Sequence, residues 1–422
     1  MFSPSIIMRA IKSLPKTGWF NLMTATGSDY YTDVKRDTQP GGAIYTSGVI
    51  ADAAYLAGGG TATDATLSKF DADGNATWQV VFGGALVDRA DSLAVASDGS
   101  VYVTGITNNA TVGTDAFVVK FDGAGALQWA KSLGSAGAVN DVGGKISLHP
   151  DGDIVVTFST PASSVVVMKM APADGAVVWK RNLASLTSYA SSVMAASTGD
   201  IYVAVTAYVG ASYYAVTAKY DASGALLWQK RLLQTLVGGA AFAMAEGVDG
   251  SIYMAHSANN YLGTLKFDSS GTVLWQTKTM ASVSGTGLGI ALDAAGNVYS
   301  SGTAGATQYV IKQDATGGMV WHRITGNGYY TFLACMPSGD LLIAGDGGAT
   351  ASSILTKYPA SLPIGTFGGR AFSVPSAAYT LTTGTLVQSA STLVESASSA
   401  VVQNATWMVA AYKAIPTAKT VF

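Results

Sequence analysis

The sequence predicts an all-β protein: a seven-bladed β-propeller of four-stranded blades, closed by an N-terminal outer strand and followed by a small C-terminal extension. Two short motifs alternate along the chain, and six tryptophans recur at intervals of 46 to 51 residues. The residues between them are β-branched or aromatic and are bounded by Gly and Asp turns. A period of roughly 40–50 residues with four short strands per unit is typical of propeller blades.

Residues 1–16 are predicted to form an arm before the ring. Basic residues lie within and after its apolar part, at Arg9, Lys12 and Lys16, whereas a secretory signal places them first. Gly18-Trp19-Phe20-Asn21 follows and has the pattern of the last strand of a blade, although no third strand precedes it.

The first motif is a Lys, an aromatic residue and an Asp, then a Gly and a Trp. It reads Lys69-Phe70-Asp71 to Gly74 and Trp78, and it recurs around Trp129, Trp228 and Trp275, with degenerate copies around Trp179 and Trp321. The second motif is a Gly turn followed by an aliphatic residue and usually a Tyr. It begins at Gly42, Gly99, Gly152, Gly199, Gly250, Gly296 and Gly339, and these seven copies predict seven blades spanning residues 17–367.

One unit shows all four predicted strands: 92–96 innermost, then 101–107, 116–121 and 126–133 outermost. In the seventh unit, Lys357-Tyr358 ends a third strand, but no Gly and Trp follow. We therefore expect the Trp19 strand to complete the blade that begins at Tyr329. Such closure removes sheet edges that would otherwise be open to aggregation.

Residues repeated in every blade are interpreted as structural, because a chemical site is needed only once. We expect the repeated tryptophans to pack between neighbouring blades: Trp19, Trp78, Trp129, Trp179, Trp228, Trp275 and Trp321. The repeated Lys and Asp share one strand face and are expected to form an ion pair or a turn hydrogen bond. Asp71-Ala72-Asp73-Gly74-Asn75 begins like a calcium loop, but Phe82 replaces the distal Glu, so an ordinary Asp turn is expected.

The candidate binding face is the side opposite the two tight turns, where the longer loops lie. Tyrosines and amides gather there: Tyr30, Tyr31, Asn108, Asn109, Tyr208, Tyr213, Tyr214, Asn259, Asn260, Tyr261, Tyr329 and Tyr330. Variable loops on a rigid scaffold commonly carry recognition, and these side chains suit glycans or a protein partner. The alternative, that they are ordinary loop residues and that some tyrosines pack in the central channel, stays open.

Composition excludes several function classes. With 24 Lys+Arg, 26 Asp+Glu and 12% charged residues, the chain has no basic surface for nucleic acid or an anionic membrane. A single cysteine, Cys335, excludes an internal disulfide framework and a cysteine-based zinc site.

The three histidines, His149, His256 and His322, occupy different places in their blades, and no catalytic motif occurs, so we expect no enzyme, cofactor or metal. The densest charge cluster, Asp88, Arg89 and Asp91, is interpreted as a rim salt bridge.

Residues 368–422 are predicted to be an attachment or oligomerisation segment. Their only charges are Arg370, Glu395, Lys413 and Lys419, and the stretch 371–394 is too polar for a transmembrane helix. Valines seven apart fit a short helix, and the Ser/Thr/Val content fits strands as well, so both remain open for 380–405. So apolar a segment should be buried against a partner protein or a second copy of the chain.

The Asp-x-x-Gly-x-x-x-Trp pattern, with turns such as Asp98-Gly99-Ser100-Val101-Tyr102, resembles bacterial and phage propellers of the SBBP and PQQ-like repeat type over about residues 17–360. Asp314-Ala315-Thr316-Gly317 to Trp321 is most similar to the quinoprotein repeat, but the quinoproteins' eight blades and calcium-site acids have no counterpart here. Chains of this kind are similar to structural proteins of tailed-phage virions.

That resemblance implies a non-enzymatic virion protein in a tail, fibre or capsid-attached position, which touches a host-surface glycan or protein or a neighbouring virion protein. The alternative is a bacterial surface, extracellular or periplasmic scaffold or lectin. A glycan-active enzyme would require converging acids on the loop face.

Overall fold

A computed structural model describes most of the ring and parts of the C-terminal segment. The described residues are 19–24, 29–37, 42–50, 63–83, 86–109, 113–134, 141–160, 164–184, 188–209, 212–232, 242–258, 261–279, 289–304, 307–327, 331–346 and 352–358, together with six short strands between 381 and 421. The predicted arm, residues 1–16, lies outside them.

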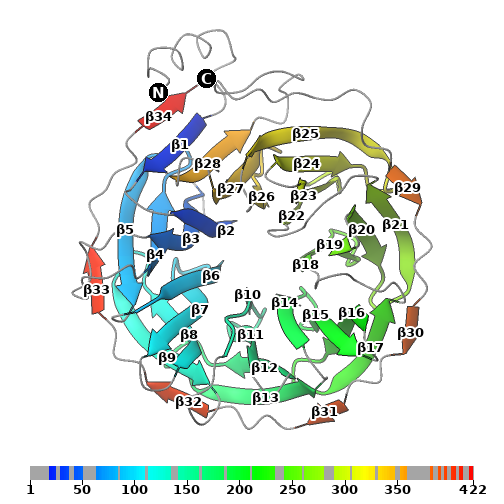
Figure 1. The fold of residues 1–422 in the computed structure, drawn as a ribbon, viewed down its shortest axis with the longest axis horizontal. Helices are drawn as coiled ribbons and strands as arrows, with labels where there is room; N and C mark the ends of the chain where they lie inside the picture. Colours follow the sequence, from blue (N-terminus) through cyan, green and yellow to red (C-terminus); the bar gives the residue numbers. More distant parts are fainter. Residues whose placement is uncertain are drawn as a thin grey trace.

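Seven blades of four antiparallel strands form a closed ring, which confirms the predicted fold (Figure 1). The innermost strands are β2 (Tyr30–Arg36), β6 (Asp88–Val95), β10 (Ile146–Leu148), β14 (Ser188–Ala195), β18 (Phe242–Glu246), β22 (Ile290–Leu292) and β26 (Thr331–Cys335). Next outward lie β3 (Ile44–Ile50), β7 (Val101–Asn109), β11 (Ile154–Thr160), β15 (Ile201–Val209), β19 (Ile252–Ala258), β23 (Val298–Ala304) and β27 (Leu341–Asp346).

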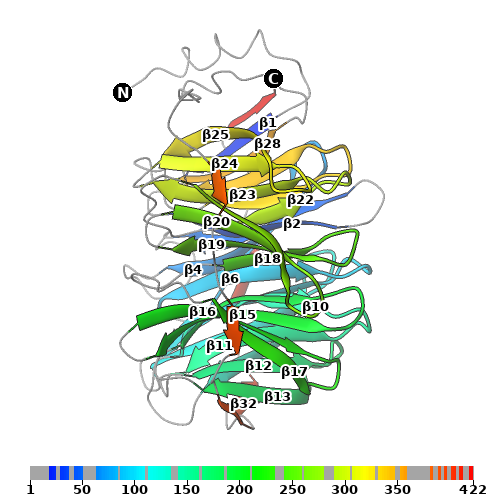
Figure 2. The ribbon, with the colours of Figure 1, turned by 90° about the vertical axis from the view of Figure 1, so that its right-hand side faces the viewer.

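The third strands are β4 (Asp64–Phe70), β8 (Gly113–Phe121), β12 (Ser164–Met170), β16 (Ser212–Tyr220), β20 (Tyr261–Phe267), β24 (Thr307–Gln313) and β28 (Ser352–Tyr358). The outer strands of blades 1 to 6 are β5 (Ala76–Gly83), β9 (Leu127–Gly134), β13 (Val177–Ala184), β17 (Leu226–Leu232), β21 (Val273–Thr279) and β25 (Met319–Asn327). Edge-on, the blades' strands run across the thickness of the disk (Figure 2). All seven copies of the Gly-turn motif lead into a second strand.

Ring closure is as predicted. The outer strand of blade 7 is β1 (Trp19–Thr24), which pairs antiparallel with β28 (Figure 1). Trp19 lies opposite Lys357, the same register that places Trp78 opposite Lys69 and continues around the ring. The N-terminal strand therefore joins the far end of the chain by six residue pairs.

The described parts of the C-terminal segment are strands, and they pair with the propeller itself. Each adds a fifth strand to a blade: β29 (Leu381–Thr383) to β21, β30 (Gln388–Ala390) to β17, β31 (Val394–Ser396) to β13, β32 (Val401–Asn404) to β9, β33 (Met408–Ala411) to β5 and β34 (Ala418–Val421) to β1. They follow the ring outside the outer strands, against the order of the blades (Figure 1). The described strands of this segment therefore pair with the chain's own propeller, and burial of the segment against a partner protein or a second copy stays a prediction.

Neighbouring blades are joined by the repeated tryptophans. The indole Nε1 of one blade donates to a main-chain carbonyl in the turn between the third and outer strands of the next: Trp78 to Gly123 at 3.2 Å, Trp129 to Pro172 at 3.2 Å, Trp179 to Ala222 at 3.0 Å, Trp228 to Ser269 at 3.1 Å and Trp275 to Ala315 at 3.1 Å. The ring of Trp179 covers Gly224, which has a φ of 79° and where a Cβ would lie 2.7 Å from the indole. The turn therefore requires glycine for its conformation and for its contact.

The repeated lysines reach the same carbonyls. Lys69 donates to Gly123 at 3.1 Å and Lys120 to Pro172 at 3.0 Å. Among the described residues, no ion pair joins the Lys to the Asp two positions later; that Asp accepts N–H groups of its own turn, as Asp221 Oδ1 does from Ala225 at 2.9 Å. The Lys instead pairs with the first turn of its own blade, as Lys219 does with Asp200 at 2.8 Å. The turn hydrogen bond predicted as one alternative is therefore present, and the Lys at the end of the third strand forms its ion pair with an Asp of a different turn.

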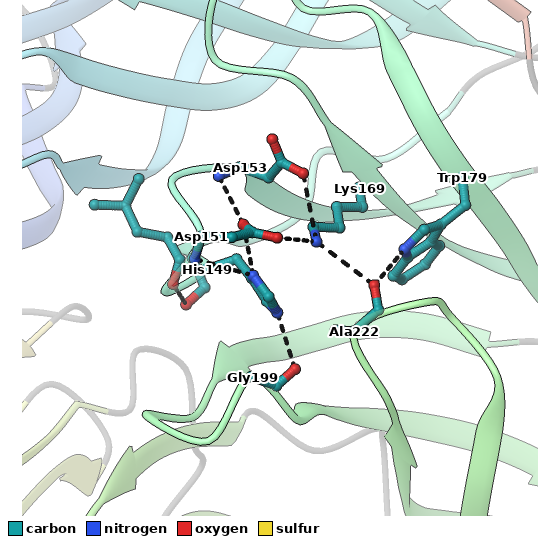
Figure 3. Close-up of polar contacts among 9 residues, drawn as sticks. His149, Asp151, Asp153, Lys169, Trp179, Gly199 and Ala222 are labelled. Atoms are coloured by element: carbon teal, nitrogen blue, oxygen red, sulfur yellow. Dashed lines mark hydrogen bonds and ion pairs between the residues drawn. The ribbon is translucent and has the colours of Figure 1, made fainter.

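Blades 3 and 4 show this arrangement in full (Figure 3). Lys169 Nζ lies 2.5 Å from Asp151 Oδ2 and 3.3 Å from Asp153 Oδ2, and the Lys169 side chain is 5% exposed. His149 joins the blades as well, with Nδ1 2.6 Å from Asp151 Oδ1 and Nε2 2.9 Å from the Gly199 carbonyl oxygen. Burial alone would raise the pKa of Asp151, but hydrogen bonds from Lys169, Asp153 N–H and His149 lower it to about 2.

The hydrophobic core lies between blades. One cluster joins Leu67 and Phe82 of blade 1 to Leu93, Val103 and Phe117 of blade 2. Phe82 and Phe117 meet edge to face, with centroids 6.0 Å apart. Each blade therefore buries apolar side chains against its neighbours.

Deleting residues 1–24 should destabilise the whole ring, because it removes the outer strand of blade 7. We expect the thermal midpoint to fall by about 10 °C or more, corresponding to a loss of several kcal/mol, as measured by circular dichroism. Deleting residues 1–17, which keeps β1, is the matched control. Equal midpoints for the two deletions would contradict closure through β1.

Lys169→Met should lower the free energy of unfolding by about 0.5–1 kcal/mol at pH 7, because it removes the ammonium from Asp151, whose side chain is 47% exposed and therefore partly screened by water. The folded pKa of Asp151 lies below its ordinary value, so this stability is present above about pH 4 and lost as pH falls through about 2. The difference between wild type and variant, from urea unfolding, should therefore shrink at pH 3. In a double-mutant cycle with Asp151→Asn, additive effects would contradict the coupling.

Candidate functional site

The predicted loop-face residues fall into three groups. The side chains of Tyr30 and Asn108 are described, and both are partly exposed. Tyr31 is only 1% exposed and packs in the core beside Val34 and Leu342, so it is not available to a ligand. The rest lie outside the described residues, either wholly or in their side chains: Asn109, Tyr208, Tyr213, Tyr214, Asn259, Asn260, Tyr261, Tyr329 and Tyr330.

The central channel holds a pocket of about 230 Å³ lined by all seven innermost strands. At one level of the channel, each blade contributes one residue at the same register against its second strand: Asp33, Ser92, Lys145, Ser192, Ala243, Gly289 and Phe332. These seven residues are called the channel ring. Its members from blades 1 to 4 are polar or charged, and those from blades 5 to 7 are apolar. The pocket is therefore amphipathic.

Asp33 is buried and fully hydrogen-bonded. Its Oδ1 accepts from Val34 N–H at 2.8 Å and from Lys35 Nζ at 3.0 Å. Its Oδ2 accepts from Ser92 Oγ at 2.9 Å and from Leu93 N–H at 3.1 Å. The carboxylate thus joins blades 1 and 2 and has its own counterion in Lys35.

Lys145 enters the pocket from just before β10. Its Nζ donates to the Asp91 carbonyl at 2.9 Å and lies 5.6 Å from the centroid of the Phe332 ring. Burial lowers the pKa of Lys145, opposed by the negative charges of Asp33 and Asp91. The Asp91 carboxylate pairs with Arg89 Nε at 2.5 Å, so the predicted salt bridge exists, but on an innermost strand beside the pocket.

Asp88, the third member of that predicted cluster, lies in a separate buried carboxyl pair. It starts β6, and its N–H donates to the carbonyl of Thr63 at 2.6 Å, next to Asp64 at the start of β4. Asp88 is 0% exposed and Asp64 5%. Burial raises the pKa of Asp64 to about 7, with a further contribution from the charge of Asp88.

The other candidate groups show no common centre. In the described part of the chain, no three His, Cys, Asp or Glu side chains come together as a metal site. At the calcium-like loop, Asp71 Oδ1 accepts from the N–H groups of Asp73 and Asn75 at 3.0 and 2.7 Å, which is an Asp turn. His256 is buried on β19, and burial lowers its pKa to about 4. None of the described segments is a helix of the length and hydropathy that crossing a bilayer requires.

The outer wall carries exposed aliphatic side chains at one repeated position. The residue before the blade tryptophan is apolar and about half exposed in four consecutive blades: Val178 (54%), Leu227 (50%), Leu274 (52%) and Val320 (52%). These four are called the outer arc. In blades 1 and 2 the same position holds Thr77 and Gln128, which are also exposed.

Sequence reasoning missed both the channel ring and the outer arc. A usable signal was present, because the Lys–Trp pairing fixes the register of every blade. When the repeats are aligned on this Lys–Trp pair, Asp33, Lys145 and Phe332 fall at the same position of their blades. That position differs in chemistry from blade to blade.

Comparison with known proteins adds little to this geometry. No family model matches the chain, and no curated protein matches it. Two solved structures are similar: the propeller of Dos1, and BBS1N in complex with ARL6DN, from crystals soaked with mercury. Each is 11% identical with a TM-score of 0.48, over 80% of this chain and 95% and 94% of the other chain respectively. Likeness at this level carries no argument, and the fold rests on the strand pairing described above.

Asp64→Asn should stabilise the protein at pH 8 and change little at pH 4. The folded pKa of Asp64, about 7, lies above its ordinary value, so stability is lost as pH rises from about 4 to 7 and regained on acidification. Urea unfolding of wild type and variant across this range measures the difference, with the exposed Asp73→Asn as control. A difference that stays constant from pH 4 to 8 would contradict the raised pKa.

Proposed function

We propose that this chain is a non-enzymatic interaction protein of a phage virion, placed in a tail, fibre or capsid-attached position. Its propeller is a rigid scaffold, consistent with an interaction role. In the proposal, the outer wall packs against a neighbouring virion protein, and the loop face, with Tyr30 and Asn108, is presented to a host-surface glycan or protein.

The outer arc is the observation that carries this proposal. Single exposed apolar residues are ordinary, but four at one repeated position in consecutive blades form a regular series along the outer wall. The blade structure does not require an apolar residue before the tryptophan, because Thr77 and Gln128 occupy this position in blades 1 and 2 without changing the strand pairing. The position tolerates polar residues, yet four blades have an apolar one there. This pattern supports the proposal that the outer arc packs against another apolar surface.

The C-terminal strands leave this part of the wall open. In blades 3, 4 and 5 the fifth strand pairs with the end of the outer strand, from Asn182, Lys230 and Thr277 onward. The arc residues lie three or four positions earlier. We therefore place the partner surface on the outer arc instead of on residues 368–422, whose described strands are already paired.

The low charge of the chain supports a partner that is a protein. Charged residues are 12% of the sequence, and the net charge is −2. A surface with so little charge gains little from electrostatic steering, and its association depends on apolar burial, at roughly 25 cal/mol per Å². The resemblance of the repeats to phage propellers supports the virion as the setting.

A quadruple variant, Val178→Thr, Leu227→Gln, Leu274→Gln and Val320→Thr, tests the proposal with residues the chain itself uses at that position. Mass spectrometry of virions purified from the phage that encodes the chain should detect the wild type. We expect the variant to keep its thermal midpoint within a few degrees but to fall at least tenfold in particle content, because burial of each side chain contributes roughly 1.5–3 kcal/mol when complete.

The matched control changes the same position in the other blades, as Thr77→Ser and Gln128→Asn, and should be incorporated normally. Absence of the wild-type chain from particles would refute the virion location. Its recovery from the cell envelope would favour the bacterial surface alternative. Normal incorporation of the quadruple variant would refute the outer arc as the docking surface.

A further inference from the structure

Counted over the described residues, the pocket of the central channel has one more cationic side chain than acidic ones. The charged side chains in and beside it are Lys35, Arg89 and Lys145 against Asp33 and Asp91. Lys35 pairs with Asp33 at 3.0 Å and Arg89 with Asp91 at 2.5 Å. Within the described residues, no carboxylate lies within ion-pair distance of Lys145 Nζ. The excess charge of +1 therefore resides on Lys145.

The ammonium of Lys145 retains hydrogen-bonding capacity. It has three N–H donors, and among the described residues it makes one hydrogen bond, to the Asp91 carbonyl. The group is partly removed from water, which is what lowers its pKa. An anion that entered the pocket would supply the missing partner in a place where competing solvent is reduced.

The acids of the pocket are not free to bind a cation. Both oxygens of Asp33 are saturated by four donors, two of them backbone N–H groups. Replacing those donors with a metal ion or an amine would leave Val34 and Leu93 N–H unpaired. The pocket therefore favours a negative ligand group over a positive one.

The far side of the channel ring is apolar. Opposite the polar half lie Ala243, Gly289 and Phe332, flanked by Met194, Met244 and Leu333. The pocket volume of about 230 Å³ is below the roughly 300–1,000 Å³ typical of drug-sized ligands. The occupant is therefore small, with one charged end and an apolar or aromatic body.

We propose that the central pocket binds a small organic monocarboxylate, with Lys145 as the counterion and Phe332 against the apolar body. The ligand's carboxylate accepts hydrogen bonds from Lys145 Nζ, and its body lies over the apolar half of the channel ring. This site is independent of the outer arc and of virion assembly.

Isothermal titration calorimetry with three matched probes tests the proposal on the full-length protein. Benzoate carries the required charge, benzamide is its neutral counterpart of similar shape, and benzylammonium reverses the charge. We expect saturable binding of benzoate, with benzamide at least about tenfold weaker because it lacks a charge-assisted hydrogen bond, and no binding of benzylammonium. Equal affinities for benzoate and benzamide, or no binding of benzoate, would overturn the proposal without any variant.

Three variants then locate the site. Lys145→Met should weaken benzoate binding at least about tenfold while leaving benzamide unchanged, and Lys145→Arg should recover much of the loss. Lys230→Met, on outer strand β17, removes the same formal charge far from the channel and should bind benzoate as wild type does. Thermal midpoints establish that each variant is folded. Undiminished benzoate binding by folded Lys145→Met, or an equal loss in Lys230→Met, would refute the role of Lys145.

Discussion

The structure depends on one main-chain carbonyl per blade. In the turn before the outer strand of blades 2 to 6, this carbonyl accepts a hydrogen bond from the tryptophan indole of the preceding blade, and in blades 2 to 5 it also accepts one from that preceding blade's repeated lysine. The aromatic ring covers the glycine of the same turn. Because these contacts cross the blade boundary, the indole N–H of one blade is satisfied by a carbonyl of the next, and the two blades are held together. Closure by β1 extends the paired sheet to the last blade and makes the ring continuous.

The sequence predicted this part of the fold well because the contact recurs. Trp spacing gave the blade length, the Gly turns gave the blade number, and the unmatched Trp19 and Lys357 indicated the closing strand. The pairing of the described strands between residues 381 and 421 could not be predicted from the sequence. Short fifth strands are held by backbone hydrogen bonds to outer edges, and such bonds leave no side-chain motif to read. The valine spacing that fitted a helix carried no information about an available edge.

The candidate site was predicted poorly for the opposite reason. A search for repeats finds the residues that the blades have in common. The central pocket is formed by residues that differ between blades, because Asp33, Lys145 and Phe332 occupy equivalent positions with different chemistry. The loop-face prediction treated neighbouring tyrosines alike, although burial in a blade depends on how far a residue lies from the end of its strand. Tyr30 is the first residue of β2 and is partly exposed, whereas Tyr31 begins a run of four buried residues and lies in the core.

The placement of β1 also determines when the ring can close during synthesis of the chain. This strand leaves the ribosome before the other strands of the ring, yet its partner β28 ends at Tyr358, more than 330 residues later. At about 5–20 residues per second, that gap lasts roughly 17–70 s. During it, blades 1 to 6 have their own strands and can pack in sequence, while the nascent chain carries β1 without its partner. A cell making this protein must keep that strand from pairing elsewhere until the ring can close.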